Sequence, residues 1–94
     1  IAYVHQKAPK AKIVLIGDFW DKERNQMRQQ AAENTNTPFA DLAPIIGDKK
    51  YQSKEGTVCE LTDGSTREVS KVEETHPGNE GMAYIADQVI EKID

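Results

Sequence analysis

The loop of residues 73–78 contains the pair of side chains best suited to acid–base chemistry. His76 stands directly before Pro77, whose ring restricts the backbone of the preceding residue, and Glu73 lies three residues upstream. An imidazole takes up and releases protons near neutral pH. A carboxylate that orients the ring completes the base-and-orienter part of a nucleophilic triad. The spacing predicts His76 as a general base and Glu73 as its acidic partner; the alternatives are a loop histidine that borders a helix and a solvated acidic loop.

A second group of candidate side chains follows the first aliphatic run of the sequence. Asp18 and Trp20 come shortly after residues 13–16. Ligands of open α/β sheets gather at the carboxyl ends of the strands. A carboxylate and a large aromatic ring at such an end are therefore candidates to line a substrate pocket. The alternative interpretations are a turn aspartate and a tryptophan that packs as an ordinary apolar side chain.

The first half of the chain alternates between helix and strand patterns. Residues 1–8 carry apolar side chains at helical spacing until Pro9, which predicts the end of a helix. Residues 13–16 are a short aliphatic run typical of a strand buried on both faces. Residues 21–35 are rich in helix formers, and residues 39–42 offer a second strand. Strands that alternate with helices favour a parallel α/β sheet.

The second half contains a predicted hairpin and a closing helix. The hairpin is expected as an insertion over residues 46–70, with Asp63-Gly64 in a type I′ turn between alternating runs. The His-Pro loop and the closing helix follow over residues 73–94. Apolar side chains recur there at helical spacing, which predicts an amphipathic helix with Asn79 as its N-cap.

Composition limits the classes of protein to which this chain can belong. It has 94 residues and a formal net charge of −4, with 37% hydrophobic and 30% charged residues. The acidic balance argues against non-specific nucleic-acid binding, which needs clustered lysine and arginine. No apolar run reaches the roughly 20 residues that a membrane-spanning helix needs. One cysteine, Cys59, excludes an internal disulfide and a cysteine-based zinc site.

The number of predicted core strands is small for an α/β domain. Two strands are too few for a parallel sheet whose faces are both covered by helices. We therefore expect residues 1–94 to form about half of an α/β domain. An unpaired sheet edge favours association, so self-association is a further expectation.

The closing segment resembles the last sequence block of the SGNH, or GDSL-type, serine hydrolases, in which Asp-x-x-His-Pro precedes an amphipathic helix. Residues 9–20 also resemble a strand of that family, which follows a proline and carries Lys-Ile-Val-Leu. The resemblance covers most of the chain but only the C-terminal part of the family's domain. In the closing block it runs through His76, Pro77, Asn79, Gly81, Ile85 and Ala86.

The resemblance implies a three-layer α/β/α, flavodoxin-like fold and hydrolysis of acyl esters of carbohydrates or lipids through an acyl-serine intermediate. It implies His76 as the general base and Glu73 at the acidic position, where aspartate is usual, with no metal or organic cofactor. The alternative partners of His76 are a backbone carbonyl and Glu74. The family's Gly-Asp-Ser block does not occur in this sequence, so the nucleophile is expected in the missing N-terminal half. The compartment stays open, although many members of the family are exported, so a secreted or periplasmic parent fits the resemblance.

Two other function classes compete with the hydrolase. One is a non-catalytic α/β interaction module, or a degenerate fragment, that pairs with another half-domain through its sheet edge. The other is a flavodoxin-like or receiver-type domain. That class predicts a phosphate loop or an acidic cluster after the first strand, and the sequence shows neither clearly.

Overall fold

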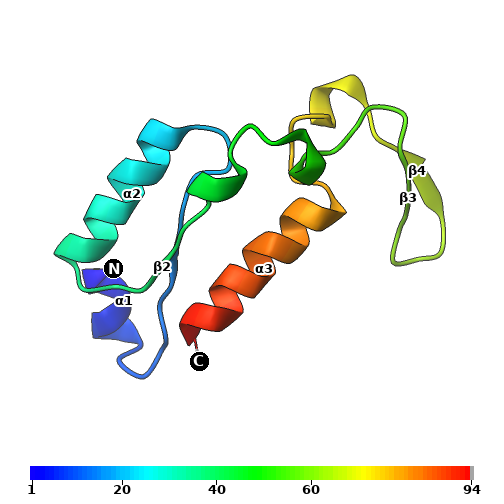
Figure 1. The fold of residues 1–94 in the computed structure, drawn as a ribbon. Helices are drawn as coiled ribbons and strands as arrows, with labels where there is room; N and C mark the ends of the chain where they lie inside the picture. Colours follow the sequence, from blue (N-terminus) through cyan, green and yellow to red (C-terminus); the bar gives the residue numbers. More distant parts are fainter. Residues whose placement is uncertain (94) are drawn as a thin grey trace. The chain divides into compact units, whose positions relative to one another are not determined.

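The computed structural model describes residues 1–93 and shows a small mixed α/β chain (Figure 1). Its regular elements are three helices, a two-stranded parallel sheet and a two-stranded antiparallel hairpin. The chain divides into two compact units. We call residues 1–47 together with the chain from Ile85 onward the sheet unit, and residues 48–84 the hairpin unit.

The sheet unit confirms the predicted parallel pairing. Strand β1 (Leu15–Ile16) lies parallel to β2 (Phe39–Ala40). The Gly17 amide donates to the Ala40 carbonyl at 2.9 Å, which continues the ladder past the end of β1. The helices that precede and join these strands are also as expected: α1 spans Ala2–Lys7 and α2 spans Lys22–Asn34.

The expected burial of the first strand on both faces is wrong. Ile16 remains 40% exposed, and β1 covers two residues instead of the four-residue run. The physical reason is that β1 has one partner strand, β2, among the described residues. A parallel strand becomes buried on both faces only when further strands and helices cover it.

A small apolar core lies in the sheet unit. The buried side chains of α2 are Asn25 and Ala32, which share one face of the helix because they are seven residues apart. The Asp21 carboxylate caps α2 by accepting from the amides of Glu23 and Arg24. The buried hydrophobic residues are Phe19, Ala32, Ala40, Leu42 and Ile45.

The hairpin forms where it was predicted, but its turn differs. Strands β3 (Val58–Glu60) and β4 (Thr66–Glu68) are antiparallel. The Leu61 amide donates to the Ser65 carbonyl, and Gly64 alone in this loop has a positive φ, of 85°. The connection is therefore a three-residue loop closed by a left-handed glycine, and the predicted type I′ turn, which needs two positive φ angles, is wrong.

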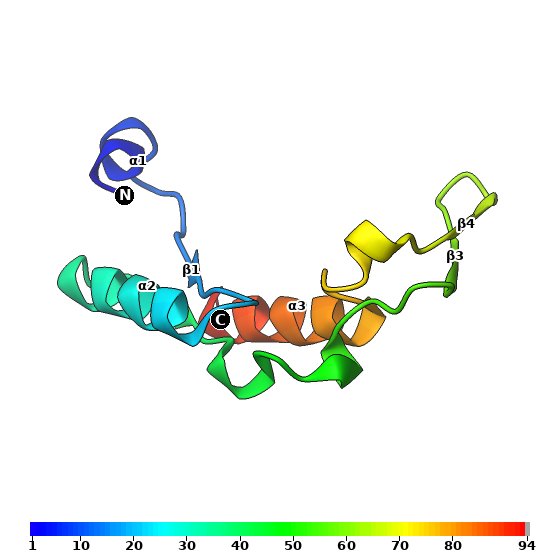
Figure 2. The same cartoon turned by 90° about the horizontal axis from the view of Figure 1, so that it is seen from above.

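The closing helix α3 spans Asn79–Ile93, and Figure 2 shows it as one continuous element. Its first turn differs from the prediction because Asn79 already lies inside the helix. The Gly78 carbonyl accepts from the Met82 amide at 2.8 Å, so Gly78 holds the N-cap position. Gly81 is the buried residue of α3. A Cβ added there would lie 2.2 Å from the Tyr51 carbonyl oxygen.

The apolar side chains along one face of α3, its apolar stripe, are less buried than is usual for an amphipathic helix. Met82, Ile90 and Ile93 are 56%, 57% and 41% exposed. The predicted spacing is therefore present, but the residues described here do not cover the stripe completely. No helix within residues 1–93 combines the length and the apolar character needed to cross a membrane.

Candidate active site

The backbone around His76 is held from two sides. Its amide donates to the Glu73 carbonyl at 3.0 Å, and its carbonyl accepts from the Ser53 amide at 2.7 Å. The next residue, Pro77, forms an isolated antiparallel bridge with Gln52. These contacts fix the loop that leads into α3, while the His76 residue itself stays exposed.

The Glu73 carboxylate is bound by a local network. Glu73 ends a short 3-10 helix, Lys71–Glu73, and forms a capping box with Ser70. Its Oε1 atom accepts from the Ser70 hydroxyl at 2.7 Å, from the Ser70 amide at 3.3 Å and from the Arg67 guanidinium. All three of these bonds go to the same oxygen, Oε1.

This network also keeps Glu73 ionised. The Ser70 hydroxyl, the Ser70 amide and the Arg67 guanidinium hold the pKa of the Glu73 carboxyl below its ordinary value. A carboxylate that stays negative at neutral pH can stabilise a neighbouring imidazolium. Glu73 is therefore a carboxylate that stays negative at neutral pH and has the Arg67 guanidinium as its paired cation.

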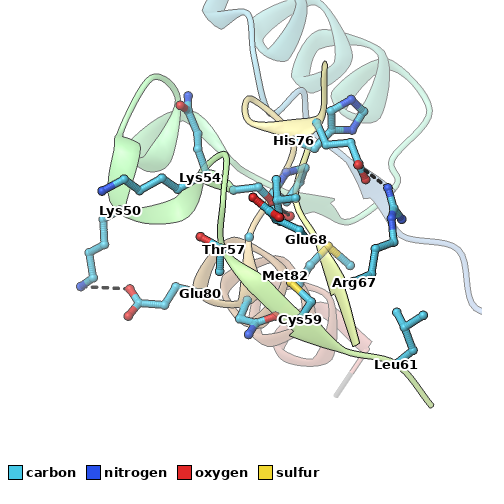
Figure 3. A pocket seen from close by; sticks show the side chains of 17 residues that line it. Lys50, Lys54, Thr57, Cys59, Leu61, Arg67, Glu68, His76, Glu80 and Met82 are labelled. Carbon is cyan, nitrogen blue, oxygen red and sulfur yellow. Dashed lines mark hydrogen bonds and ion pairs between the residues drawn. The ribbon is translucent and has the colours of Figure 1, made fainter. Parts of the chain in front are cut away.

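His76 and Glu73 line the same cavity in the hairpin unit, with a volume of about 510 Å³ (Figure 3). That volume lies in the range of small-molecule sites. One wall comes from the hairpin, and the rest comes from the His-Pro loop, the first turn of α3 and the segment after Lys50. The hairpin wall consists of Thr57, Cys59, Leu61, Arg67, Glu68 and Val69.

Most charges around this cavity are paired with each other. Arg67 bonds to Glu73, and the Lys50 Nζ atom lies 3.8 Å from a carboxylate oxygen of Glu80 (Figure 3). The lining also contains the half-buried thiol of Cys59. Residues 1–93 contain no group of three or more His, Cys, Asp or Glu side chains placed to hold a metal ion.

Asp18 and Trp20 belong to the sheet unit, and neither lines the cavity that contains His76. Asp18 is 3% exposed, and its Oδ1 atom accepts from the amides of Trp20 and Asp21 at 2.8 and 2.7 Å. The Trp20 side chain is 54% exposed and meets the Phe19 ring edge-on at 5.6 Å. Asp18 thus organises the turn that presents Trp20.

The charge state of Asp18 follows from opposing effects. Burial alone raises the pKa of its carboxyl. The amides of Asp21 and Trp20, together with the Arg28 guanidinium 3.5 Å away, outweigh burial and leave the pKa below its ordinary value of 3.8.

Sequence reasoning missed Asn25, which lies 2% exposed at the carboxyl ends of both parallel strands. Its Oδ1 atom accepts from the Asp18 amide at 3.0 Å and the Leu42 amide at 3.4 Å. Its Nδ2 atom donates to Asp41 at 2.8 Å. The sequence around Asn25 resembles a solvated helix and does not predict that this side chain is buried. Gly17 is the one related signal, because a Cβ added there would lie 1.9 Å from the Asn25 Oδ1 atom.

No protein-family model matches the chain, and the comparisons with curated proteins and with solved structures find no match. The functional assignment therefore depends on the residues and on their geometry. The structure brings His76 and Glu73 together at one cavity, and Asp18 and Trp20 lie together in the other unit.

Proposed function

We propose that this chain is the C-terminal part of an SGNH/GDSL-type serine hydrolase that cleaves acyl esters of carbohydrates or lipids. His76 would be the general base and Glu73 its acidic partner. The observation that carries the proposal is that both residues line one cavity of about 510 Å³ at the start of α3. The fixed loop backbone and the ionised Glu73 carboxylate support the same roles.

The proposed reaction uses a serine from the N-terminal part of the domain. His76 accepts the serine hydroxyl proton while the serine oxygen attacks the ester carbonyl. It then gives that proton to the leaving alcohol, which leaves an acyl-serine. In the second half, His76 takes a proton from water, the resulting hydroxide attacks the acyl carbon, and the proton returns to the serine as the acid leaves. Glu73 stabilises the imidazolium in both halves.

The three-layer α/β/α architecture is part of the same proposal. The parallel pair β1–β2 and the flanking helices α2 and α3 support it, because parallel strands normally lie in larger sheets covered by helices. The exposed apolar side chains of Ile16 and Ile90 are surfaces that further strands and helices of such a domain would cover.

The two histidines of the sequence provide a matched test. In the whole protein that carries this sequence, His76→Ala should lower the kcat/KM for p-nitrophenyl acetate by roughly 10²–10⁴-fold. His5→Ala removes the same side chain from α1, outside this cavity, and should leave the rate unchanged. A fluorophosphonate probe should label a serine in the same protein.

Turnover that survives His76→Ala contradicts the proposed role of His76. Absence of both turnover and probe labelling in the whole protein contradicts the hydrolase. That second result favours the alternative, a non-catalytic α/β module that pairs with another half-domain.

A further inference from the structure

Arg67 joins the hairpin to the loop that carries His76. Its Nη2 atom bonds to the Oε1 atom of Glu73, and a dashed line marks this ion pair in Figure 3. The other bonds described for that oxygen come from Ser70, at the start of the same short helix. Within residues 1–93, Arg67 therefore supplies the contact to the Glu73 carboxylate that comes from a separate element, β4.

The backbone of Arg67 is fixed by the hairpin ladder. Arg67 lies opposite Cys59 in the antiparallel register. Past the end of β4, the Val69 amide donates to the Thr57 carbonyl at 2.8 Å. The ladder thus reaches the residue directly before Ser70, so the strand that carries the guanidinium has a defined position beside the short helix that ends at residue 73.

Glu73 is in turn joined to His76 through the backbone. The Glu73 carbonyl accepts from the His76 amide at 3.0 Å, and both residues line the same cavity. The Ser70 hydroxyl and amide, followed by the Arg67 guanidinium, hold the pKa of the Glu73 carboxyl below its ordinary value. The side chain is therefore an anion that two separate elements hold, in the loop of the proposed base.

The other charged groups on the cavity lining differ from Arg67 in their contacts. The Lys50 Nζ atom lies 3.8 Å from a carboxylate oxygen of Glu80. Lys54 and Glu68 also line the cavity, and no ion pair described within residues 1–93 includes either of them. Of the cations on this lining, Arg67 is thus the one that is bonded to the proposed acidic partner.

We propose that Arg67 is a positioning residue of the proposed active site. It holds the Glu73 carboxylate in one orientation, so that the negative charge is in place when His76 becomes an imidazolium. The inference rests on the proposed function, because it gives the hairpin a role toward His76. A guanidinium presents its donors in a rigid plane, which restricts a carboxylate more than a rotating hydroxyl does. Arg67 acts through Glu73 and not on the substrate.

The titration of Glu73 tests this contact without catalysis. In the whole protein that carries this sequence, carboxyl ¹³C chemical shifts followed against pH report the pKa of Glu73. Arg67→Met removes the neighbouring cation and should raise this pKa, whereas Arg67→Lys keeps the charge and should leave the pKa closer to that of the wild type. Lys54→Met is the matched control, because it removes a cation of the same lining that is not bonded to Glu73, and it should raise the pKa less. Equal rises in Arg67→Met and Lys54→Met overturn the proposed contact.

The activity of the same protein tests the catalytic consequence. Arg67→Met should lower the kcat for p-nitrophenyl acetate by about tenfold or more and change KM by less than about twofold, because Glu73 acts on the imidazolium and not on the bound ester. Arg67→Lys should recover most of the lost kcat. Arg24→Met removes an arginine of α2 that is paired with Asp21, outside the cavity, and should leave both constants unchanged.

The outcomes separate the positioning role from the proposed function. An unchanged kcat in Arg67→Met, beside an inactive His76→Ala, overturns the positioning role and leaves the hydrolase intact. A change confined to KM also overturns it, because that result assigns Arg67 to substrate binding. Full turnover in His76→Ala overturns the proposed function, whatever the titration of Glu73 shows.

Discussion

At the scale of single residues, buried polar groups are the most constrained parts of the sheet unit. Asn25 uses both ends of its amide, accepting from the loop after β1 and donating to the segment after β2. Asp18 accepts two backbone amides and faces Arg28. Such groups are costly to leave unpaired, so each is expected to tolerate substitution poorly.

Removal of the Asn25 side chain should be strongly destabilising. Asn25→Ala leaves the buried Asp18 amide without its acceptor and removes one donor to Asp41, which keeps the Ala43 amide. We therefore expect a loss of about 2 kcal/mol in the free energy of unfolding. Urea denaturation followed by circular dichroism measures it. Asn34→Ala, at the exposed end of the same helix, should change stability by less than about 0.5 kcal/mol. Equal losses in the two variants would contradict the role of the network.

The lowered pKa of Asp18 predicts a specific pH dependence. A carboxyl whose folded-state pKa lies below its unfolded value stabilises the fold above the unfolded pKa. That contribution is lost as the pH falls through the lower, folded-state value. The unfolding free energy of the wild type should therefore fall below about pH 4. Asp18→Asn should be less stable than the wild type at pH 7, and the difference between the two should shrink on acidification; a constant difference from pH 7 to pH 2 argues against the assignment.

At the scale of elements, α3 and the hairpin have different supports. The first turn of α3 is held by the close approach of Gly81 to the Tyr51 backbone and by an edge-on contact of Tyr51 with Tyr84 at 5.6 Å. The hairpin is held by its ladder, its glycine-closed turn and the Arg67–Glu73 ion pair. A close backbone approach tolerates less change than an exposed ladder, because it leaves no room for added atoms.

Gly81 supplies the test at this scale. Glycine to alanine within a helix normally stabilises by up to about 1 kcal/mol. At Gly81 the added Cβ would lie 2.2 Å from the Tyr51 carbonyl oxygen, so the neighbouring backbone must move. We expect this steric overlap to outweigh the gain in helix propensity, so that Gly81→Ala lowers the free energy of unfolding by about 1 kcal/mol or more. A raised melting temperature would show that this approach does not constrain α3.

At the scale of the whole molecule, burial is unevenly distributed. All five buried hydrophobic residues belong to the sheet unit, and Gly81 is the buried residue of the hairpin unit among those described. The accessible apolar side chains of β1 and α3 accord with a chain that completes a larger domain. The proposed activity therefore belongs to the whole protein that contains His76.

This view predicts the behaviour of the 94-residue chain alone. The sequence contains no Gly-Asp-Ser block, so the chain should hydrolyse p-nitrophenyl acetate no faster than free histidine does. A steady-state rate assay at pH 7–8 measures this, with free histidine at equal concentration as the reference. Turnover well above that background would show that another residue of this chain acts as a nucleophile.

Local signals in the sequence predicted most of the elements. Alternation and the Asp63-Gly64 pair placed the hairpin, and helical spacing placed α3 within a residue of its observed start. His76 and Glu73 are three positions apart in the sequence and line the same cavity, while their catalytic roles stay a prediction. The turn type and the N-cap were wrong, because both depend on backbone angles that several residue types share.

The sequence by itself determined the helices, the strands and the loop that carries His76, because hydrophobic period, proline and glycine act over a few neighbouring residues. Tertiary structure alone decided that Asn25 joins the ends of two strands, that Arg67 and Ser70 occupy one oxygen of Glu73, and that the hairpin forms a wall of the cavity. Apart from the Ser70 capping box, these features depend on contacts between separate elements. Such contacts depend on register and close packing, which no local pattern encodes.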